Sequence, residues 1–362
     1  MAAEERKQRA EWSRFLRWLV RGAISLGLIA LLLAHTDLER AAYWLTRLDP
    51  WWLLLAVAIK GTGILAGIVR WKLLLDGQQL RLPLANLGGA YLIGRFFGSF
   101  LPSTIGLDAY RTYYASVRTR QVARSVAVTV VEKVIGLFAL SGLALAAIPF
   151  GLRLLPHDVL WLLGLAMCVP IGASALVLLW PGLFLRLAGW LQGRGRKLVG
   201  GLARMSEAVG QFGRQRGRLL LATLLGFVVH GATASMYVAT ARAVGADVPA
   251  AEILFIGPLM IAATLVPVSI AGIGVREGTY VFFLAAVGVP TEQAALLGFL
   301  GFLAGEVYSL IGGAVWLLKP AARPDSDDRL VAVIRRAAAW ARRREPGPAV
   351  EAEPPAGPGV GS

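Results

Sequence analysis

Eight charged residues lie in stretches of this sequence that are otherwise apolar enough to enter a lipid bilayer. They are four cations and four carboxylates: Lys60, Arg95, Arg111, Arg276, Asp108, Glu132, Glu277 and Glu306. A charge at membrane depth is costly, so such residues usually face a cavity or a charged partner. Arginine suits phosphate in particular, because its planar guanidinium can make two parallel hydrogen bonds. The set therefore predicts a binding site for an anionic group. The alternative interpretation is that these charges only pair internally and hold the helices together.

Two of the arginines have the same spacing from a proline. Arg111 follows Pro102 by nine residues, and Arg276 follows Pro267 by nine residues. Proline ends a helix, because its ring clashes with the preceding turn and it lacks an N–H group. Broken backbone at membrane depth is tolerated only where protein or a water-filled cavity satisfies it. We therefore expect Arg111 and Arg276 to flank one site and jointly hold an anionic headgroup. The expected structural breaks are Pro102, Gly106, Pro267, Gly272 and Gly274. Two unrelated proline-kinked helices would give the same pattern.

The composition places these residues in a polytopic membrane protein. Of the 362 residues, 56% are hydrophobic and only 16% are charged, whereas about a quarter of the residues of a soluble domain are charged. The mean hydropathy is +0.62. The predicted fold class is all-α, with apolar spans at 18–34, 51–69, 126–150, 159–180, 219–244 and 291–318 and proline-broken segments at 87–124 and 254–285.

Lysine and arginine predict the orientation of these spans. The net charge is +15, and the basic residues gather between apolar runs, as at Arg70 and Lys72 after the span 51–69. Such residues mark cytoplasmic loops. Both flanks of the first broken segment are basic, so we expect it to enter and leave the membrane on the cytoplasmic side. Parity then makes the second broken segment enter and leave from outside. The chain is thus predicted to contain two inverted repeats, about 51–149 and 219–318, each with a re-entrant hairpin.

The composition of the remaining segments predicts how they are arranged around the repeats. Residues 1–17 are basic and amphipathic, and we expect a short helix on the membrane surface. The basic linker 181–218 is expected in the cytoplasm, within a transmembrane domain of residues 18–320. Residues 321–362 are expected to form a cytoplasmic tail that is first basic and then disordered. Both termini are therefore predicted to lie in the cytoplasm.

Other chemistry finds little support in the sequence. The three histidines are far apart and there is one cysteine, so we expect no metal site and no cofactor. No motif of a hydrolase, a transferase or a nucleic-acid-binding module is recognisable, and the chain is expected not to be an enzyme. His230 lies in an apolar span, where it could relay protons or, as is more common, donate a hydrogen bond to a neighbouring helix.

Four segments resemble the flippase-like membrane domain of lysylphosphatidylglycerol synthases. They read FGSFLPSTIG at 97–106, DAYR at 108–111, VEK at 131–133 and PVSIAGIGVREG at 267–278, and the resemblance covers about residues 20–320. The family commonly has a glycine pair before the aspartate, where this chain has Gly106 and Leu107. It also commonly has a glycine where this chain has Ala271. These departures leave the substrate open.

The resemblance implies lipid translocation. We expect a stand-alone member without the soluble transferase domain, which moves an anionic or aminoacylated phospholipid, or a lipid-linked headgroup, between the leaflets of a bacterial inner membrane. A separate partner enzyme would then make the lipid. Two alternatives stay open, namely an integral-membrane transferase or its accessory subunit acting on a lipid, and a carrier for small solutes.

Overall fold

The computed structural model describes residues 38–99, 105–180, 182, 186, 207, 209–213, 215–265 and 272–318. Every regular element within these residues is a helix, which confirms the predicted all-α class. The chain divides into two compact units, Met1–Trp316 and Leu317–Ser362. The arrangement described below concerns the first of these units.

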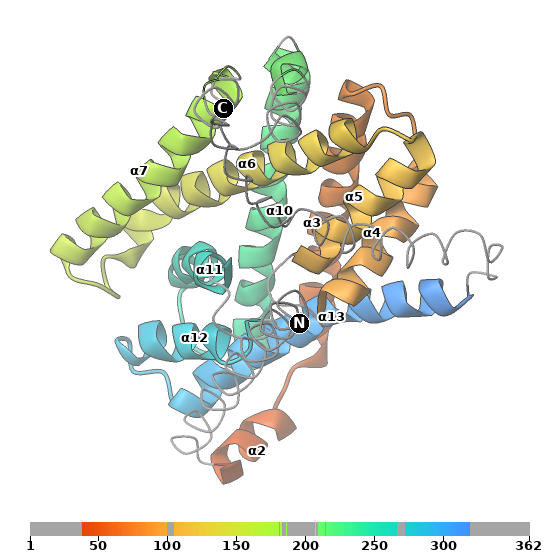
Figure 1. Ribbon diagram of the computed structural model, residues 1–362. Helices are drawn as coiled ribbons and strands as arrows, with labels where there is room; N and C mark the ends of the chain where they lie inside the picture. The colour runs from red at the N-terminus through yellow and green to blue at the C-terminus, as the bar shows by residue number, and fades with distance from the viewer. Residues whose placement is uncertain are drawn as a thin grey trace, which may run out of the picture. The chain divides into compact units, whose positions relative to one another are not determined.

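The helices follow one another along the chain as Figure 1 shows. They are α2 (Leu38–Thr46), α3 (Pro50–Gly77), α4 (Leu84–Ser99), α5 (Ile105–Thr119), α6 (Val122–Ala147), the 3-10 helix η1 (Ile148–Gly151), α7 (His157–Leu179), α10 (Arg216–Ala243), α11 (Ala250–Leu265), α12 (Val275–Ala285) and α13 (Thr291–Leu318). Five of them, α3, α6, α7, α10 and α13, are long and apolar enough to cross a membrane. They correspond to five of the six predicted spans, so the chain is a multi-pass membrane protein.

Several predicted segments lie outside the described residues. These are the surface helix 1–17, the first span 18–34, the tail 321–362 and most of the linker 181–218. The predictions for these segments stay predictions.

α3 is longer than the sequence predicts, and this changes the place of two basic residues. Asp49 caps the helix by accepting a first-turn backbone N–H at 2.9 Å, and Pro50 supplies the fixed φ of the first turn. The helix continues to Gly77, so Arg70 and Lys72 lie inside it and not on a flanking loop. Arg70 is only 7% exposed. Arg70 is therefore a charge inside the protein, and the span 51–69 was predicted too short at this end.

α3 and α10 run antiparallel over their full lengths. At one end the Asp49 N–H donates to the Ala243 carbonyl at 3.0 Å. At the other end the Gln215 side-chain amide donates to the Gly77 carbonyl at 2.9 Å. Figure 1 shows the two helices side by side, with α6 and α11 packed against α10. This pair therefore provides the frame on which the shorter helices are placed.

Each proline-broken segment contains a pair of short helices. α4 and α5 pack against each other on either side of residues 100–104, and α11 and α12 do so on either side of residues 266–271. Pro102 and Pro267 lie outside the described residues. Gly106 is buried in the first turn of α5, while Gly272 and Gly274 precede α12 with φ of +75° and +84°. That left-handed backbone favours glycine, so these two glycines interrupt the helical backbone before α12.

α13 crosses α4 at very close range. A Cβ atom at Gly312 would clash with the Leu92 carbonyl oxygen, and one at Gly313 would lie 2.9 Å from the Phe96 ring. Small residues of this kind let helices approach closely inside a membrane. The start of α13 is tied to the end of α10, because the Gln293 side chain donates to the Val244 carbonyl at 2.8 Å.

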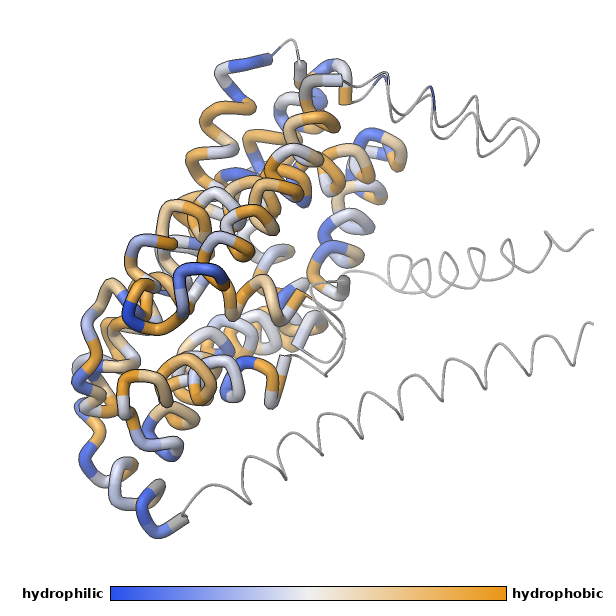
Figure 2. Tube along the Cα trace, turned by 90° about the vertical axis from the view of Figure 1, so that its left-hand side faces the viewer, coloured by the Kyte–Doolittle hydropathy of each residue, from blue (hydrophilic) through white to orange (hydrophobic). Residues whose placement is uncertain are grey.

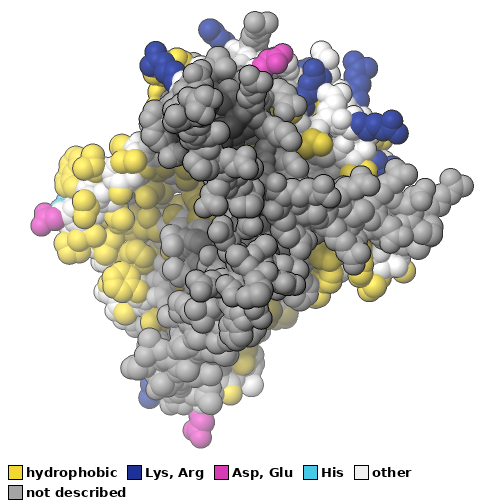
Figure 3. Space-filling view, viewed as in Figure 1, with side chains coloured by type: hydrophobic (Ala, Val, Ile, Leu, Met, Phe, Trp, Pro, Cys, Tyr) yellow, Lys and Arg dark blue, Asp and Glu magenta, His cyan; other side chains and the backbone are white. Residues whose placement is uncertain are grey.

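The outer surface of the long helices is apolar. Figure 2 shows hydrophobic residues along most of their length, and in Figure 3 hydrophobic side chains cover α7. Trp161, Leu165 and Val169 of α7 are all largely exposed. Lysine and arginine side chains gather instead at the top of the view in Figure 3. A long apolar face bounded by charge fits contact with lipid.

Candidate functional site

A cavity of about 490 Å³ lies among α3, α4, α5, α6, α10, α11, α12 and α13. Seven of the eight charged residues singled out in the sequence line it, namely Lys60, Arg95, Arg111, Arg276, Asp108, Glu132 and Glu306. Arg111 on α5 and Arg276 on α12 therefore face one cavity, although they come from different halves of the chain. Glu277 is not among the lining residues.

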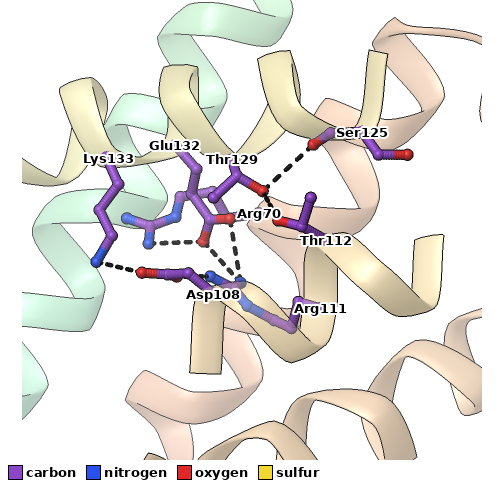
Figure 4. Close-up of polar contacts among 8 residues, drawn as sticks. All are labelled: Arg70, Asp108, Arg111, Thr112, Ser125, Thr129, Glu132 and Lys133. Atoms are coloured by element: carbon purple, nitrogen blue, oxygen red, sulfur yellow. Dashed lines mark hydrogen bonds and ion pairs between the residues drawn. The ribbon is translucent and has the colours of Figure 1, made fainter. Parts of the chain in front are cut away.

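Arg111 is at the centre of a buried ion-pair network (Figure 4). Its guanidinium donates to both oxygens of Glu132 at 3.0 and 3.1 Å and to Asp108 at 2.7 Å. Arg70 donates to the same Glu132 at 3.0 Å, and the Lys133 ammonium lies 2.6 Å from Asp108. Three cations from α3, α5 and α6 thus share two carboxylates. The two carboxylates are thus bound from within the protein, whereas Arg70 Nε, Arg70 Nη1 and Arg111 Nε are buried without a hydrogen-bond partner in the part of the chain that the structure describes.

Aromatic rings and a hydroxyl pair hold the α5 side of this network in place. The guanidinium carbon of Arg111 lies 5.3 Å from the Trp71 ring centroid and 4.9 Å from that of Tyr91, which are favourable cation–π positions. At the next residue of α5, the hydroxyl of Thr112 lies 2.5 Å from that of Thr129 and joins α5 to α6 (Figure 4). The Arg111 side chain is therefore held in one orientation by aromatic packing as well as by its ion pairs.

A second group of charges lines the cavity where α3, α4, α10 and α13 meet. The Lys60 ammonium donates to the Thr233 hydroxyl at 2.9 Å, and Arg95 donates to the Gly305 carbonyl at 2.9 Å. Glu306 accepts a hydrogen bond from the Ser99 hydroxyl at 2.6 Å. Among the described residues, Lys60 and Arg95 form no ion pair, since both donate to neutral oxygens.

Arg276 and Glu277 are neighbours in sequence with different surroundings. The guanidinium carbon of Arg276 lies 4.4 Å from the Phe302 ring centroid, and its side chain also lies against Tyr237. Glu277 is buried and accepts the Gly274 N–H at 2.7 Å, which caps the start of α12. The carboxylate is 4.0 Å from Arg276. Glu277 thus holds the helix that carries Arg276 and does not itself line the cavity.

The cavity lining carries more positive than negative charge. Six lining residues are cations, namely Lys60, Arg70, Arg95, Arg111, Lys133 and Arg276, and three are carboxylates, namely Asp108, Glu132 and Glu306, which leaves a formal excess of three positive charges. Low-dielectric walls strengthen the field of such an excess inside a protein. The arrangement is therefore suited to attracting and holding an anion.

Lys133 lines the cavity although it was not among the eight candidates, and so does Arg70, which the sequence analysis placed at the end of a span. Arg70 lies ten residues after Lys60 on α3, which is about 15 Å along a helix axis. The signal for a longer helix was the apolar run Leu73, Leu74 and Leu75, which begins three residues after it. The neutral partners of the second group, such as Thr233, had no signal in the sequence, because they come from a distant part of the chain.

The remaining chemical candidates can also be placed. His230 of α10 lines the cavity and makes a hydrogen bond with the Gly136 backbone of α6, which agrees with the more common of its two expected roles; the proton relay stays untested. Within the described ranges, no group of three His, Cys, Asp or Glu residues could hold a metal ion. Arginine, lysine and carboxylate side chains are thus the groups that this site offers to a ligand.

Comparison with known proteins places the chain in a sequence context. Residues 18–312 match the family model described as the lysylphosphatidylglycerol synthase TM region. The matched range includes every residue that lines the cavity. No curated protein matches the chain.

Proposed function

The chain belongs to the family of the lysylphosphatidylglycerol synthase transmembrane region, and on that premise we propose that it moves a lipid with an anionic headgroup between the two leaflets of a membrane. We propose that the protein lies in the inner membrane of a bacterium and that a separate enzyme makes the lipid. The headgroup would pass through the charged cavity, while the acyl chains stay at the apolar outer face of the helices.

The excess positive charge of the cavity is the observation that carries the proposal. Lys60 and Arg95 form no ion pair within the described residues and donate to neutral oxygens instead. Glu306 lines this side of the cavity together with Lys60, Arg95 and Arg276, so two formal positive charges remain unbalanced there. Such charges are costly inside a membrane protein, and an anionic ligand would offset that cost. We assign the headgroup phosphate to the side of the cavity that Lys60, Arg95 and Arg276 line.

Arg111 has a different part in this proposal from the one that its spacing predicts. Its guanidinium already binds Glu132 and Asp108, so a phosphate would have to compete with two carboxylates. We propose that Arg111 holds the wall of the cavity in place and that Lys133, which is half-exposed, meets the headgroup first. The sequence analysis expects Arg111 and Arg276 to hold the headgroup jointly. We now propose that Arg276 contacts the phosphate and that Arg111 does not.

The proposal includes the inverted repeats, with α3 to α6 as one half and α10 to α13 as the other. The antiparallel pairing of α3 and α10 supports it. The last helix of each half also contacts the first helix of the other: α6 packs against α10, and the Tyr308 hydroxyl of α13 donates to the Val57 carbonyl of α3 at 3.0 Å. A binding site between such repeats can open to either side in turn. The pairs α4–α5 and α11–α12 would be the re-entrant hairpins.

Reconstitution of the full chain into vesicles tests the proposal. A fluorescent phosphatidylglycerol placed in one leaflet should redistribute faster than in protein-free vesicles, and the recovered lipid should be chemically unchanged. Arg276→Gln should slow redistribution by roughly tenfold or more, because a charge-assisted contact with phosphate is worth about 2–5 kcal/mol when one partner is truncated. The matched control is Arg242→Gln, which removes an exposed arginine at the end of α10.

One observation favours the second candidate, a membrane transferase or its accessory subunit. Asp108 and Glu306 face the same cavity as the cations, and a carboxylate beside cations could act as a base toward a lipid hydroxyl. The same vesicles separate the two functions. A lipid that is recovered with a new covalent group would support the transferase and contradict the translocase.

A further inference from the structure

A second cavity, of about 610 Å³, lies where the end of α3 meets the start of α10, and it shares no residue with the first. Three cations line it, Lys72, Arg81 and Arg218, together with one carboxylate, Asp76. Lys72 holds both oxygens of Asp76 at 2.5 Å. Arg81, in contrast, is exposed and forms no ion pair within the part of the chain that the structure describes. The second cavity therefore has two arginines that no carboxylate of its own lining holds.

One residue that lines this cavity, Gln79, has a left-handed backbone conformation that usually favours glycine. Gln79 has φ of +61°, and the Leu80 N–H donates to the Leu75 carbonyl at 2.9 Å. Glycine is usual at this left-handed position after a helix. Strain of this kind is kept where the side chain has a use, and the exposed Gln79 amide lines the cavity. It adds a neutral hydrogen-bond donor to the three cations.

Exposed apolar side chains lead away from the cavity along both helices. On α3, Leu65 is 64% exposed and Val69 43%, and Val69 lies one turn before Lys72. On α10, Leu221 is 48% exposed and lies one turn after Arg218. Both helices are long and apolar enough to cross a membrane. In a bilayer that these two helices cross, the cavity at their charged end would lie at the level of the lipid headgroups, and the exposed leucines would lie at that of the acyl chains.

We propose that the second cavity binds the phosphate of an anionic phospholipid that stays bound and is not transported. Arg81 from the α3–α4 connection and Arg218 from α10 would hold the phosphate, and Gln79 would complete the donor set. The lipid would join the ends of the two antiparallel helices and the start of α4. The same donors suit free phosphate from solution, so the source of the phosphate has to be tested.

The experiment measures the lipids that remain bound to the purified full chain after exchange into nanodiscs of phosphatidylglycerol and phosphatidylcholine. Arg81→Gln and the double variant Arg81→Gln/Arg218→Gln are compared with the control Arg153→Gln/Arg242→Gln, which removes two other exposed arginines. The loss of each of these two arginines should weaken retention of phosphatidylglycerol by roughly fivefold. Arg81→Gln alone keeps the test valid if the double variant does not fold, since Arg81 makes no described polar contact.

Loss of phosphatidylglycerol in the site variants, with the control and the phosphatidylcholine content unchanged, would support the proposal. An equal loss in the control pair would overturn it, because general surface charge would then explain the binding. Inorganic phosphate serves as the competing probe. If millimolar phosphate binds the parent protein and the site variants keep their phosphatidylglycerol, the source is soluble and the lipid site is wrong. Transport is not needed for this readout, so its outcome is independent of the proposed function.

Discussion

Arg111 and Arg276 have equal spacing from a proline but different electrostatic surroundings. Arg111 binds two carboxylates and is packed against two aromatic rings. Arg276 lies 4.0 Å from one carboxylate, which is engaged in capping α12. The two residues should therefore respond differently to the same substitution. Arg111 should affect stability first, and Arg276 should affect ligand binding first.

Replacing Arg111 by glutamine should destabilise the fold. The change leaves Glu132 with Arg70 and Asp108 with Lys133, and losing a hydrogen bond to a charged group costs about 1.5–3 kcal/mol. Thermal unfolding in detergent, followed by helix content, would measure it. The control is Lys72→Met, which breaks the partly exposed pair with Asp76 and should cost less than about 1 kcal/mol. Equal shifts of the two midpoints would argue against a special role for the network.

Lys60→Met should have opposite effects on stability and on transport. The ammonium of Lys60 donates to a hydroxyl and has no ion pair among the described residues. A charged side chain at the centre of a membrane helix costs about 2.5–3.5 kcal/mol on insertion scales, so its removal should raise the unfolding midpoint. Lipid redistribution should slow in the same variant. A variant that is both less stable and fully active would contradict the assignment of Lys60 to the ligand.

At the scale of elements, glycines decide how closely the helices approach. A Cβ at Gly312 would meet the backbone of α4, whereas nothing lies within 4 Å of a Cβ at Gly231 in α10. Gly312→Ala should therefore destabilise by about 1–3 kcal/mol through overpacking. Gly231→Ala should stabilise by about 0.5–1 kcal/mol, because glycine is a poor helix residue. Thermal midpoints of the two variants test this, and a gain in stability at Gly312 would show that α13 does not cross α4 as described.

The long elements were predictable from sequence because their apolar runs are nearly continuous. The span 291–318 coincides with α13, and four further spans correspond to α3, α6, α7 and α10. The span 51–69 was predicted too short because the charge of Arg70 was taken as its end, whereas Arg70 continues the helix and pairs with Glu132 of α6 inside the protein. A partner 62 residues away has no local signal.

Most charged residues of the candidate site could be predicted from the sequence, but the ion pairs between them could not. Proline spacing indicated that Arg111 and Arg276 belong together, and both line one cavity. Which carboxylate binds which cation depends on how α5, α6 and α13 pack. Glu277 shows the limit of the approach, since its sequence position beside Arg276 does not reveal that it caps α12.

At the scale of the whole molecule, the basic ends of α3 and α10 meet, since Gly77 and Gln215 are in contact. The opposite ends meet at Asp49 and Ala243. The positive-inside rule then places the Gly77 end in the cytoplasm. This orientation is a prediction that labelling can test.

Cysteine labelling tests the orientation directly. In a Cys168→Ser background, a membrane-impermeant thiol reagent should label Asp247→Cys in intact cells and Arg118→Cys only after permeabilisation. Both positions are exposed in the structure, and Cys168 has to be removed because it is exposed as well. Labelling of Arg118→Cys from outside, or of both positions from the same side, would contradict inverted repeats in this orientation.

The measurement that tests the central claim most directly is leaflet redistribution of fluorescent phosphatidylglycerol in vesicles that contain the double variant Lys60→Met/Arg95→Gln. Among the cations that line the first cavity, these two are the ones for which the described residues provide no ion pair. We expect the parent protein and the control Arg153→Gln/Arg242→Gln to accelerate redistribution. In the double variant the rate of redistribution should fall by roughly a hundredfold, which is about tenfold for each 1.4 kcal/mol of binding free energy lost. Redistribution at the parental rate by a folded double variant would contradict this expectation.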